Sequence, residues 1–472
     1  MFHAFPNLLP GGFLGVDIFF VISGYLITGL IQDAIAAGIF RVTAFYARRI
    51  RRIVPALLLV LTASFVAGWF MLLPLEYRLL GANITGGALF FTNVQFVLQS
   101  VYFDRFAQTK PLLHLWSLSV EEQFYLVWPF VMMWAAAVRA RMVPIILGIA
   151  VASFAADVVI VDFYSPNAAF YLPFTRFWEL MLGAAVCALG TRATRRTGRT
   201  ASTLAAGCLV IIVASVAVPI ALQPDGSSPP WWNLLPTLAT AGLMATAAGT
   251  WPARALLGVK PMVWLGKISY PLYLWHWPLL SFLAIGTFGE SSVAARIAAV
   301  AAALALAQVT YVFVERPIRF GAHPERWVPR LAAALLAVAA VGSIDNRAVG
   351  FPARIPQPLR RYVVVNEDYK AETRALTCSL PELVPASAYA AECYRPRRSG
   401  ERSIFVWGDS FAARLYTGLA TTYEPAVNVR QMTRDQGVPL LGRSLFPTCN
   451  DSNARPTSAI SRSRLRSTSC RS

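Results

Sequence analysis

The chain has 472 residues, of which 56% are hydrophobic and 14% are charged. This balance indicates a membrane protein and argues against a soluble globular one. The 42 Lys and Arg residues outnumber the 24 Asp and Glu residues and give a net charge of +18. Because the basic residues stand in short clusters between apolar runs, they fit cytoplasmic loops, and no nucleic-acid partner is expected.

The apolar runs predict an all-α, multi-pass membrane protein with about ten spans. Residues 1–10 are too short to span, and we interpret them as the end of a first helix that is otherwise missing. The first full run, residues 13–31, contains Asp17, and a dense basic cluster follows at residues 40–52. The later runs approach the roughly 20 residues that a membrane helix needs. They cover residues 53–73, 113–137, 143–161, 169–189, 203–222, 232–248, 263–285, 293–314 and 328–341.

The basic cluster sets the expected orientation in the cytoplasmic (inner) membrane. With residues 40–52 inside, alternating spans place the other Arg-rich and Lys-rich connections inside and the acidic or neutral ones outside. This arrangement requires that the apolar stretch 81–99, which contains several Asn and Gln residues, does not span. The chain after residue 341 is then extracytoplasmic.

The six cysteines fall into separate regions. Cys187 and Cys208 lie in apolar runs, where cysteine packs as a small hydrophobe, and Cys449 and Cys470 have no evident partner. A disulfide between Cys378 and Cys393 is expected if their region faces an oxidising space. No cluster has metal-ligand spacing, so no metal is expected.

We expect residues 1–342 to form the membrane domain, and the rest of the chain divides into three parts. Residues 343–400, which are rich in Pro, Arg and Ala, are expected to form an extracytoplasmic linker. Residues 401–453 contain SIFVWGDSFAAR, a strand, a turn and a helix start that could present Ser410 as a nucleophile. Residues 454–472 contain no acidic or aromatic residue, which fits a disordered basic tail or, more readily, a wrong reading frame.

The most informative stretch is KPLLHLWSLSVEEQFYLVWPF, residues 110–130. It has the apolar content of a membrane helix, yet it carries His114, Glu121 and Glu122. An ionisable residue at the centre of a membrane helix costs roughly 2.5–3.5 kcal/mol, so such residues usually serve a function. The structural alternative is a polar helix end, and an interfacial cap is likewise the alternative for Glu315 and Arg316.

Five motifs together resemble the acyltransferase 3 membrane family, in the same order along the chain. They are FHAFPNLLPGGFLGVDIFFVISGYLIT (residues 2–28), FYARRIRRIVPALL (45–58), HLWSLSVEEQFYLVWP (114–129), WLGKISYPLYLWHWPLL (264–280) and FVERPIR (313–319). The resemblance covers about residues 1–340. VWGDSFAARLY, residues 406–416, is similar to the first block of the SGNH hydrolase-like domain often fused to such membrane domains.

The resemblance implies transfer of an acyl group, most often acetyl, from cytoplasmic acetyl-CoA to a hydroxyl of an extracytoplasmic saccharide. The expected acceptor is a cell-surface polysaccharide such as lipopolysaccharide, or a lipid-linked glycan, met at the membrane lipid. Two rivals stay open. A transporter of a polar or acylated substrate would explain the spans and buried charges, although no internal repeat is visible. A non-functional remnant would explain the ends of the chain.

The family motifs assign roles to particular residues. His3 matches the family's essential histidine, which would act as general base or carry the acyl group. The family's upstream arginine has no counterpart in this chain. His114, Glu121 and Glu122 match the central catalytic motif, and Asp17 is expected to pair with a basic residue of a neighbouring helix. The expected coenzyme A contacts are Arg48, Arg49, Arg51, Arg52, Glu315 and Arg316.

Two residues remain outside this assignment. His276 lies between Trp275 and Trp277 near the middle of a run, and we interpret it as a packing histidine more readily than as a catalyst. Ser410 has no base in its own domain, since no histidine follows His323 in the chain. The SGNH-like part is therefore not expected to work as a Ser-His-Asp triad enzyme.

Overall fold

The computed structural model describes the chain except residues 1, 100–107, 164–165, 194–197, 218–229, 248, 364–372, 381–383, 385, 395–401, 425 and 435–472. The chain divides into two compact units, Met1–Gln357 and Pro358–Ser472. The first unit therefore includes the expected membrane domain and the start of the expected linker.

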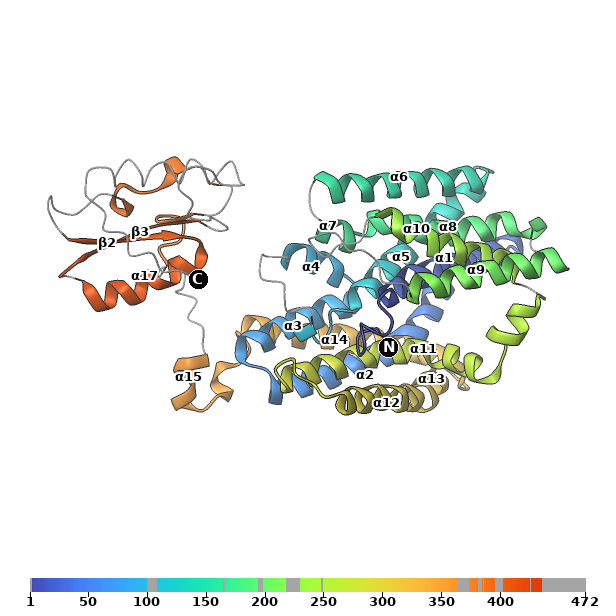
Figure 1. Ribbon diagram of the computed structural model, residues 1–472. Helices are drawn as coiled ribbons and strands as arrows, with labels where there is room; N and C mark the ends of the chain where they lie inside the picture. The colour runs from blue at the N-terminus through green and yellow to red at the C-terminus, as the bar shows by residue number, and fades with distance from the viewer. Residues whose placement is uncertain are drawn as a thin grey trace. The chain divides into compact units, whose positions relative to one another are not determined.

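The first unit is a bundle of helices (Figure 1). Its α-helices are α1 (Gly15–Ala36), α2 (Val42–Met71), α3 (Pro74–Ala88), α4 (Thr92–Gln99), α5 (Leu115–Ala137), α6 (Met142–Phe163), α7 (Pro166–Tyr171), α8 (Pro173–Ala193), α9 (Arg199–Ala217), α10 (Pro230–Thr246), α11 (Lys260–Gly286), α12 (Val293–Val309), α13 (Arg316–Phe320) and α14 (Trp327–Arg347). Short turns of 3₁₀ or π type are η1 (Gly12–Leu14), η3 (Ala253–Leu257), η4 (Thr310–Glu315), η5 (Pro324–Arg326) and η6 (Pro352–Arg354), and α15 (Gln357–Val363) follows.

Six helical stretches in the described part of the chain are long and apolar enough to cross a membrane. They are Gly12–Ala36, Val42–Met71, Met142–Val161, Arg199–Ala217, Val293–Phe320 and Pro324–Arg347. The other four predicted spans coincide with α5, α8, α10 and α11, which are helical but are not among these six stretches. A multi-pass helical membrane unit is thus confirmed, and the count of about ten spans stays a prediction.

Two segments differ from a simple series of spans and loops. The stretch 81–99 forms parts of α3 and α4, which have 15 and 8 residues. At 1.5 Å per residue, both are shorter than the roughly 30 Å of a bilayer core. The basic cluster at residues 40–52 is helical rather than a loop, because α2 begins at Val42 and carries the arginines in its first turns.

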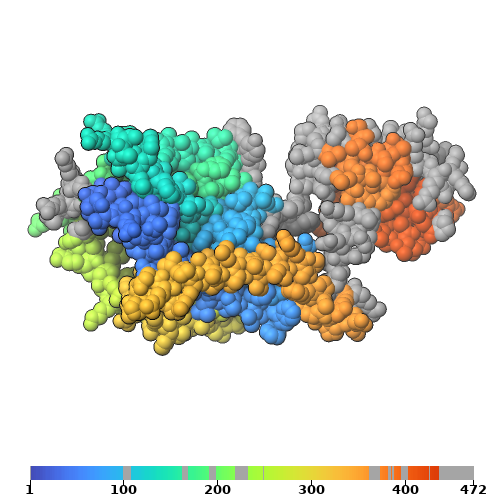
Figure 2. Space-filling view, turned by 180° about the vertical axis from the view of Figure 1, so that it is seen from behind, coloured from blue at the N-terminus to red at the C-terminus, as the bar shows by residue number. Residues whose placement is uncertain are grey.

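Helix α5 occupies the middle of the first unit. Its residues Trp116, Val120 and Phe124 join an apolar cluster with side chains of α1, α6 and α8. Leu115 and Leu118 join a second cluster with side chains of α2, α3, α11 and α14. The helix is therefore buried on two sides, which places its polar residues inside the protein rather than toward lipid. Figure 2 shows α14 crossing the back of the unit, where it packs on α2 and α3.

Helices α1 and α8 cross at very short range. A Cβ atom on Gly24 would lie 1.9 Å from the carbonyl oxygen of Leu180, and one on Gly183 would lie 1.9 Å from that of Val21. Only glycine fits at either position. This close approach brings the polar residues at the outer turns of the two helices within ion-pairing distance.

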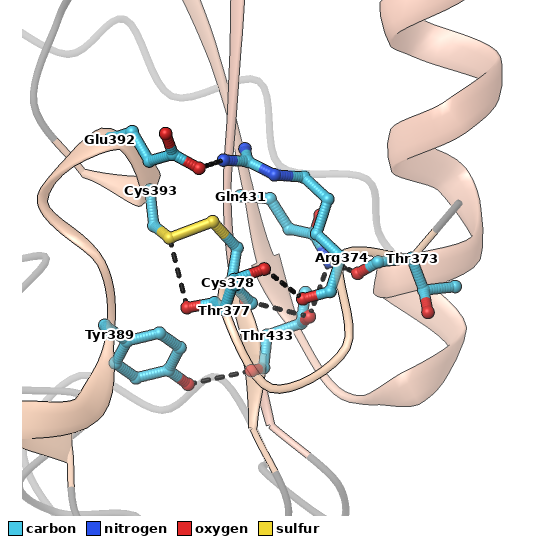
Figure 3. Close-up of a disulfide and its surroundings, with 9 residues drawn as sticks. All are labelled: Thr373, Arg374, Thr377, Cys378, Tyr389, Glu392, Cys393, Gln431 and Thr433. Atoms are coloured by element: carbon cyan, nitrogen blue, oxygen red, sulfur yellow. Dashed lines mark hydrogen bonds and ion pairs between the residues drawn. A yellow bond between two sulfur atoms is a disulfide. The ribbon is translucent and has the colours of Figure 1, made fainter. Parts of the chain in front are cut away.

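The second unit contains a three-stranded parallel sheet with the order β1-β3-β2. The strands are β1 (Ser379–Leu380), β2 (Ser403–Gly408) and β3 (Asn428–Arg434), and α17 (Ser410–Tyr423) connects β2 to β3. Cys378 and Cys393, the pair expected from the sequence, form a disulfide with a Cα–Cα distance of 5.3 Å. Figure 3 shows the disulfide beside β3, where Tyr389 donates a hydrogen bond of 2.8 Å to the Thr433 carbonyl. The disulfide therefore fastens the loop before β2 to the sheet.

Candidate active site

Three of the four histidines of the chain meet in the first unit, although they are far apart in the sequence. The His3 and His276 rings stack with their centroids 5.6 Å apart. The His276 and His114 rings meet edge to face at 5.8 Å. We call these three residues the histidine cluster. The sequence analysis selected His3 and His114 and interpreted His276 as packing, so the third member is a finding of the structure.

Helix α11 holds the histidine cluster together. The Nδ1 atom of His276 lies 2.7 Å from the carbonyl oxygen of Tyr273, one turn earlier. The Tyr273 hydroxyl donates to the carbonyl of His114 and lies 2.9 Å from the Ser117 hydroxyl. Trp277 donates through Nε1 to the carbonyl of Lys110 at 2.7 Å. These bonds fasten α11 to the start of α5, so the positions of His114 and His276 are fixed relative to each other.

His114 is almost completely buried, with 6% of its surface exposed. Its ring lies near the Leu274 carbonyl, which has no helical partner because Pro278 lacks an N–H group. This carbonyl is an electrostatic partner of the ring, and neither ring nitrogen forms a regular hydrogen bond with a described residue. The ring is therefore the deeply packed member of the histidine cluster.

His3 stands on the turns that precede α1, and its environment comes from three directions. Its ring packs edge-on against Trp277 at 4.5 Å and against Phe2 at 4.9 Å. Arg296 of α12 donates to the carbonyl of Ala4 at 3.1 Å, next to His3. The segment is thereby held to α11 and α12, while the His3 side chain keeps an exposed face.

The two neighbouring glutamates of α5 lie near the basic cluster of α2. Ser23 donates to Glu121 at 2.5 Å, and Tyr125 donates to the same carboxylate oxygen. Both Glu121 and Glu122 interact electrostatically with Arg49 and Arg52. Both carboxylates therefore lie within the electrostatic range of the same two arginines.

A pocket of about 280 Å³ opens beside one of these arginines, Arg52. Arg52, Lys267 and Arg319 contribute three positive charges to its lining, and Glu315 contributes one negative charge. Glu315 is buried and forms an ion pair with Arg319 one turn later. Tyr270 joins the lining and donates to the Ile53 carbonyl at 2.8 Å, which closes α11 onto α2. We call this hollow the basic pocket.

The structure sorts the expected coenzyme A residues into three groups. Arg52 and Glu315 line the basic pocket. Arg49 lies over the Tyr125 ring at 5.7 Å, near the glutamate pair. The remaining three do not line the pocket: Arg48 and Arg316 are exposed, and Arg51 donates to Ala47 of its own helix at 3.3 Å.

Sequence reasoning did not select Lys267 or Arg319. Both stand inside motifs that the sequence analysis quoted, Lys267 in WLGKISYPLYLWHWPLL and Arg319 in FVERPIR. Their helical spacing carried a signal, since Lys267 precedes Tyr270 by three residues and Arg319 follows Glu315 by four. Their approach to α2 could not be inferred from one sequence.

A second buried polar group, the carboxylate cluster, joins α1 and α8. Arg176 lies 2.5 Å from Asp17 and 3.1 Å from Glu179, and all three are at most 4% exposed. Asp157 of α6 adds a third carboxylate to their electrostatic surroundings. The expectation that Asp17 pairs with a base of a neighbouring helix is confirmed. The guanidinium also lies over the Trp116 ring at 5.8 Å, so the cluster supports the start of α5.

Ser410 begins α17 directly after β2, in the expected strand-turn-helix arrangement. Asp409 caps the helix by accepting from the Phe411 N–H at 2.9 Å. Residues 358–472 contain no histidine. Among the described residues of the whole chain, no group of His, Cys, Asp or Glu is arranged to hold a metal ion.

Comparison with known proteins identifies a family and several relatives. A family model described as an acyltransferase domain matches residues 2–312. Peptidoglycan O-acetyltransferase OatA of Listeria monocytogenes is 29% identical over 337 residues, which cover 67% of this chain and 53% of that protein. Putative peptidoglycan O-acetyltransferase YrhL of Bacillus subtilis is 31% identical over 336 residues, which cover 67% and 52%.

A third relative, O-acetyltransferase OatA of Staphylococcus aureus, is 29% identical over 334 residues, which cover 68% of this chain and 54% of that protein. The chain thus spans about half the length of the curated relatives it matches. No solved structure matches the chain.

Proposed function

Because the chain belongs to the acyltransferase family, we propose that it transfers an acyl group, acetyl first of all, from acyl-CoA to a hydroxyl of a cell-envelope saccharide. The proposal needs a place for the donor, a place for the reaction and a connection between them. The first unit offers all three, largely on helices within residues 2–312, the range that the family match covers.

The basic pocket is the proposed place for the donor. Three positive charges around a hollow of about 280 Å³ suit the phosphates of coenzyme A, because guanidinium and ammonium groups bind phosphate oxygens through charge-assisted hydrogen bonds. The glutamate pair beside Arg49 and Arg52 would hold these arginines in place. The donor would enter from the cytoplasm, where the basic cluster of α2 is expected to lie.

The histidine cluster is the proposed place of the reaction, and α11 connects it to the pocket. Lys267 and His276 are nine residues apart on this one helix, which corresponds to about 13 Å at 1.5 Å per residue. An extended pantetheine arm can bridge that distance. This is the observation that carries the proposal, since phosphates bound at one end of α11 leave the thioester near the three histidines.

The acceptor is proposed to reach the histidine cluster from the outer side of the cytoplasmic membrane, where His3 has an exposed face. The names of two relatives point to peptidoglycan as the saccharide. Lipopolysaccharide and a lipid-linked glycan remain chemically equivalent acceptors, since each offers a sugar hydroxyl at the membrane lipid surface. The disulfide of the second unit supports an extracytoplasmic position for that unit, because disulfides persist in oxidising compartments.

A reconstituted assay tests the proposal. The full chain in proteoliposomes is supplied with radiolabelled acetyl-CoA outside or inside the vesicle and with peptidoglycan fragments on the opposite side. Covalent label on the saccharide supports acyl transfer, whereas uptake of substrate without covalent label would favour a transporter. His323→Ala serves as the matched control for His3→Ala, since the His323 side chain is 60% exposed and lies outside the histidine cluster.

A further inference from the structure

We propose that His276 is a second catalytic residue of the transfer reaction and moves a proton between the acceptor hydroxyl and His3. This inference rests on the proposed acyl transfer and adds a role for a residue that the sequence alone favoured as packing. It starts from the hydrogen bond of the His276 ring, which defines the nitrogen that is available to accept a proton.

The contact of His276 with Tyr273 decides the tautomer of the ring. A carbonyl oxygen only accepts hydrogen bonds, so the Nδ1 atom at 2.7 Å from it must carry the proton. The neutral ring then has its lone pair on Nε2, where it can accept a proton. When it does so, the Nδ1–H bond to the carbonyl becomes charge-assisted and stronger, which stabilises the protonated ring.

The position of His276 between the other two rings suits proton movement. Its ring stacks on His3 at 5.6 Å and is half-buried, and the proposed step places the acceptor hydroxyl beside both rings. His114 closes the other side at 5.8 Å and is buried. His3, by contrast, is held by ring contacts and has an exposed face, which suits a residue that must meet a donor and then an acceptor.

The chemistry balances in two steps. First, a ring nitrogen of His3 attacks the thioester carbonyl, a C–N bond forms, the C–S bond breaks, and the departing sulfur receives the proton that His3 gives up. Second, the acceptor oxygen attacks the acyl-imidazole while its proton passes to Nε2 of His276. The C–O bond forms, the C–N bond breaks, and His276 returns the proton to the departing nitrogen of His3. Both histidines end in their starting states.

Two substitutions separate a proton carrier from a packing residue. His276→Asn can keep an N–H donor for the Tyr273 carbonyl but lacks a base at the Nε2 position. His276→Gln keeps a polar group near the Nε2 position but cannot accept a proton there. Each variant is prepared as the full chain in proteoliposomes beside His3→Ala and His323→Ala, supplied with radiolabelled acetyl-CoA, and followed with and without peptidoglycan fragments.

The expected result is a protein-bound label in both His276 variants, formed at the rate of the unmodified chain. The rate at which the labelled acyl group is transferred from the protein to the saccharide should fall by about 10²–10⁴-fold, the range of general acid-base catalysis. His3→Ala should form no label. Transfer by His276→Asn at the unmodified rate would overturn the inference, as would a failure of both variants to form the label while eluting as intact protein. If the unmodified chain transfers nothing, the proposed function itself fails.

Discussion

The first unit contains two buried polar groups that a hydropathy profile treats alike, and the structure shows them to be opposites. In the carboxylate cluster, Arg176 is enclosed between Asp17 and Glu179, and almost no surface is exposed. In the histidine cluster the contacts are between rings or from ring to carbonyl, and His3 has an exposed face. Paired charges without access hold helices together, whereas imidazole rings that meet other rings and backbone carbonyls, with one of them exposed, suit a reaction.

His3→Ala tests the reactive side of this comparison and should have the largest effect. Loss of the histidine that activates the acceptor or carries the acyl group should reduce the rate of acyl transfer by about 10²–10⁴-fold. The melting temperature in detergent should stay within error of the unmodified chain, because the side chain is exposed. Equal losses in His323→Ala would show that the assay responds to something other than the histidine cluster.

Arg176→Ala tests the structural side. Removing the guanidinium leaves buried carboxylates without their partner, and breaking a buried ion pair typically costs about 3–5 kcal/mol. We expect a lower melting temperature by intrinsic fluorescence and a lower yield of folded protein. Arg41→Ala, at an exposed position, is the control. A variant that is fully stable but inactive would reverse the comparison and move the carboxylate cluster into the reaction.

Lys267→Ala sharpens the comparison by testing the basic pocket, which is proposed to bind the acyl donor that reacts at the histidine cluster. Loss of one phosphate contact of three should raise the KM for acetyl-CoA about 10-fold, equivalent to about 1.4 kcal/mol, with little change in kcat. Lys260→Ala, two turns earlier on α11 and outside the pocket, should leave both constants unchanged. A fall in kcat with an unchanged KM would argue against donor binding at this pocket.

Tyr273→Phe should have the smallest effect. The substitution removes the hydroxyl that bonds to the His114 carbonyl and Ser117, but keeps the backbone carbonyl that fixes His276. One neutral hydrogen bond is worth about 0.5–1.5 kcal/mol, so turnover should fall by about 2–10-fold. A loss as large as that of His3→Ala would mean that the phenol itself takes part in the reaction.

Much of the helical architecture could be predicted from the sequence because apolar runs of about 20 residues have few alternatives in a membrane. The ten predicted runs correspond to ten helices of the first unit. The differences between the predicted and the observed helices were confined to single segments. The arginines at residues 48–52 were placed in a loop, because charge clusters usually mark loops, but packing on α11 and α13 extends α2 through them.

The site was harder to predict than the helices. The polar residues of α5 stood out because charge inside an apolar run is costly. The partners of the buried polar residues could not be predicted, since Arg176 lies 159 residues from its partner Asp17 and Tyr273 lies 159 residues from its partner His114. A single sequence carries no record of such pairings. The sequence favoured packing for His276 because two tryptophans beside a histidine resemble a core, and only the distances to His3 and His114 place it in the histidine cluster.

The π-helical turn η4 has a consequence for how this site tolerates insertions and deletions. A π turn holds one residue more than an α-helical turn, so deleting a residue within Thr310–Glu315 would restore the ordinary register. A deletion inside this turn would therefore leave the orientation of the following residues nearly unchanged, whereas a deletion within α12, an ordinary α-helix, would rotate them by about 100°. Glu315 and Arg319 would then leave the lining of the basic pocket together, although neither had been changed. The lining of the pocket therefore depends on the number of residues in α12, and the π turn is the place where a change of length is tolerated.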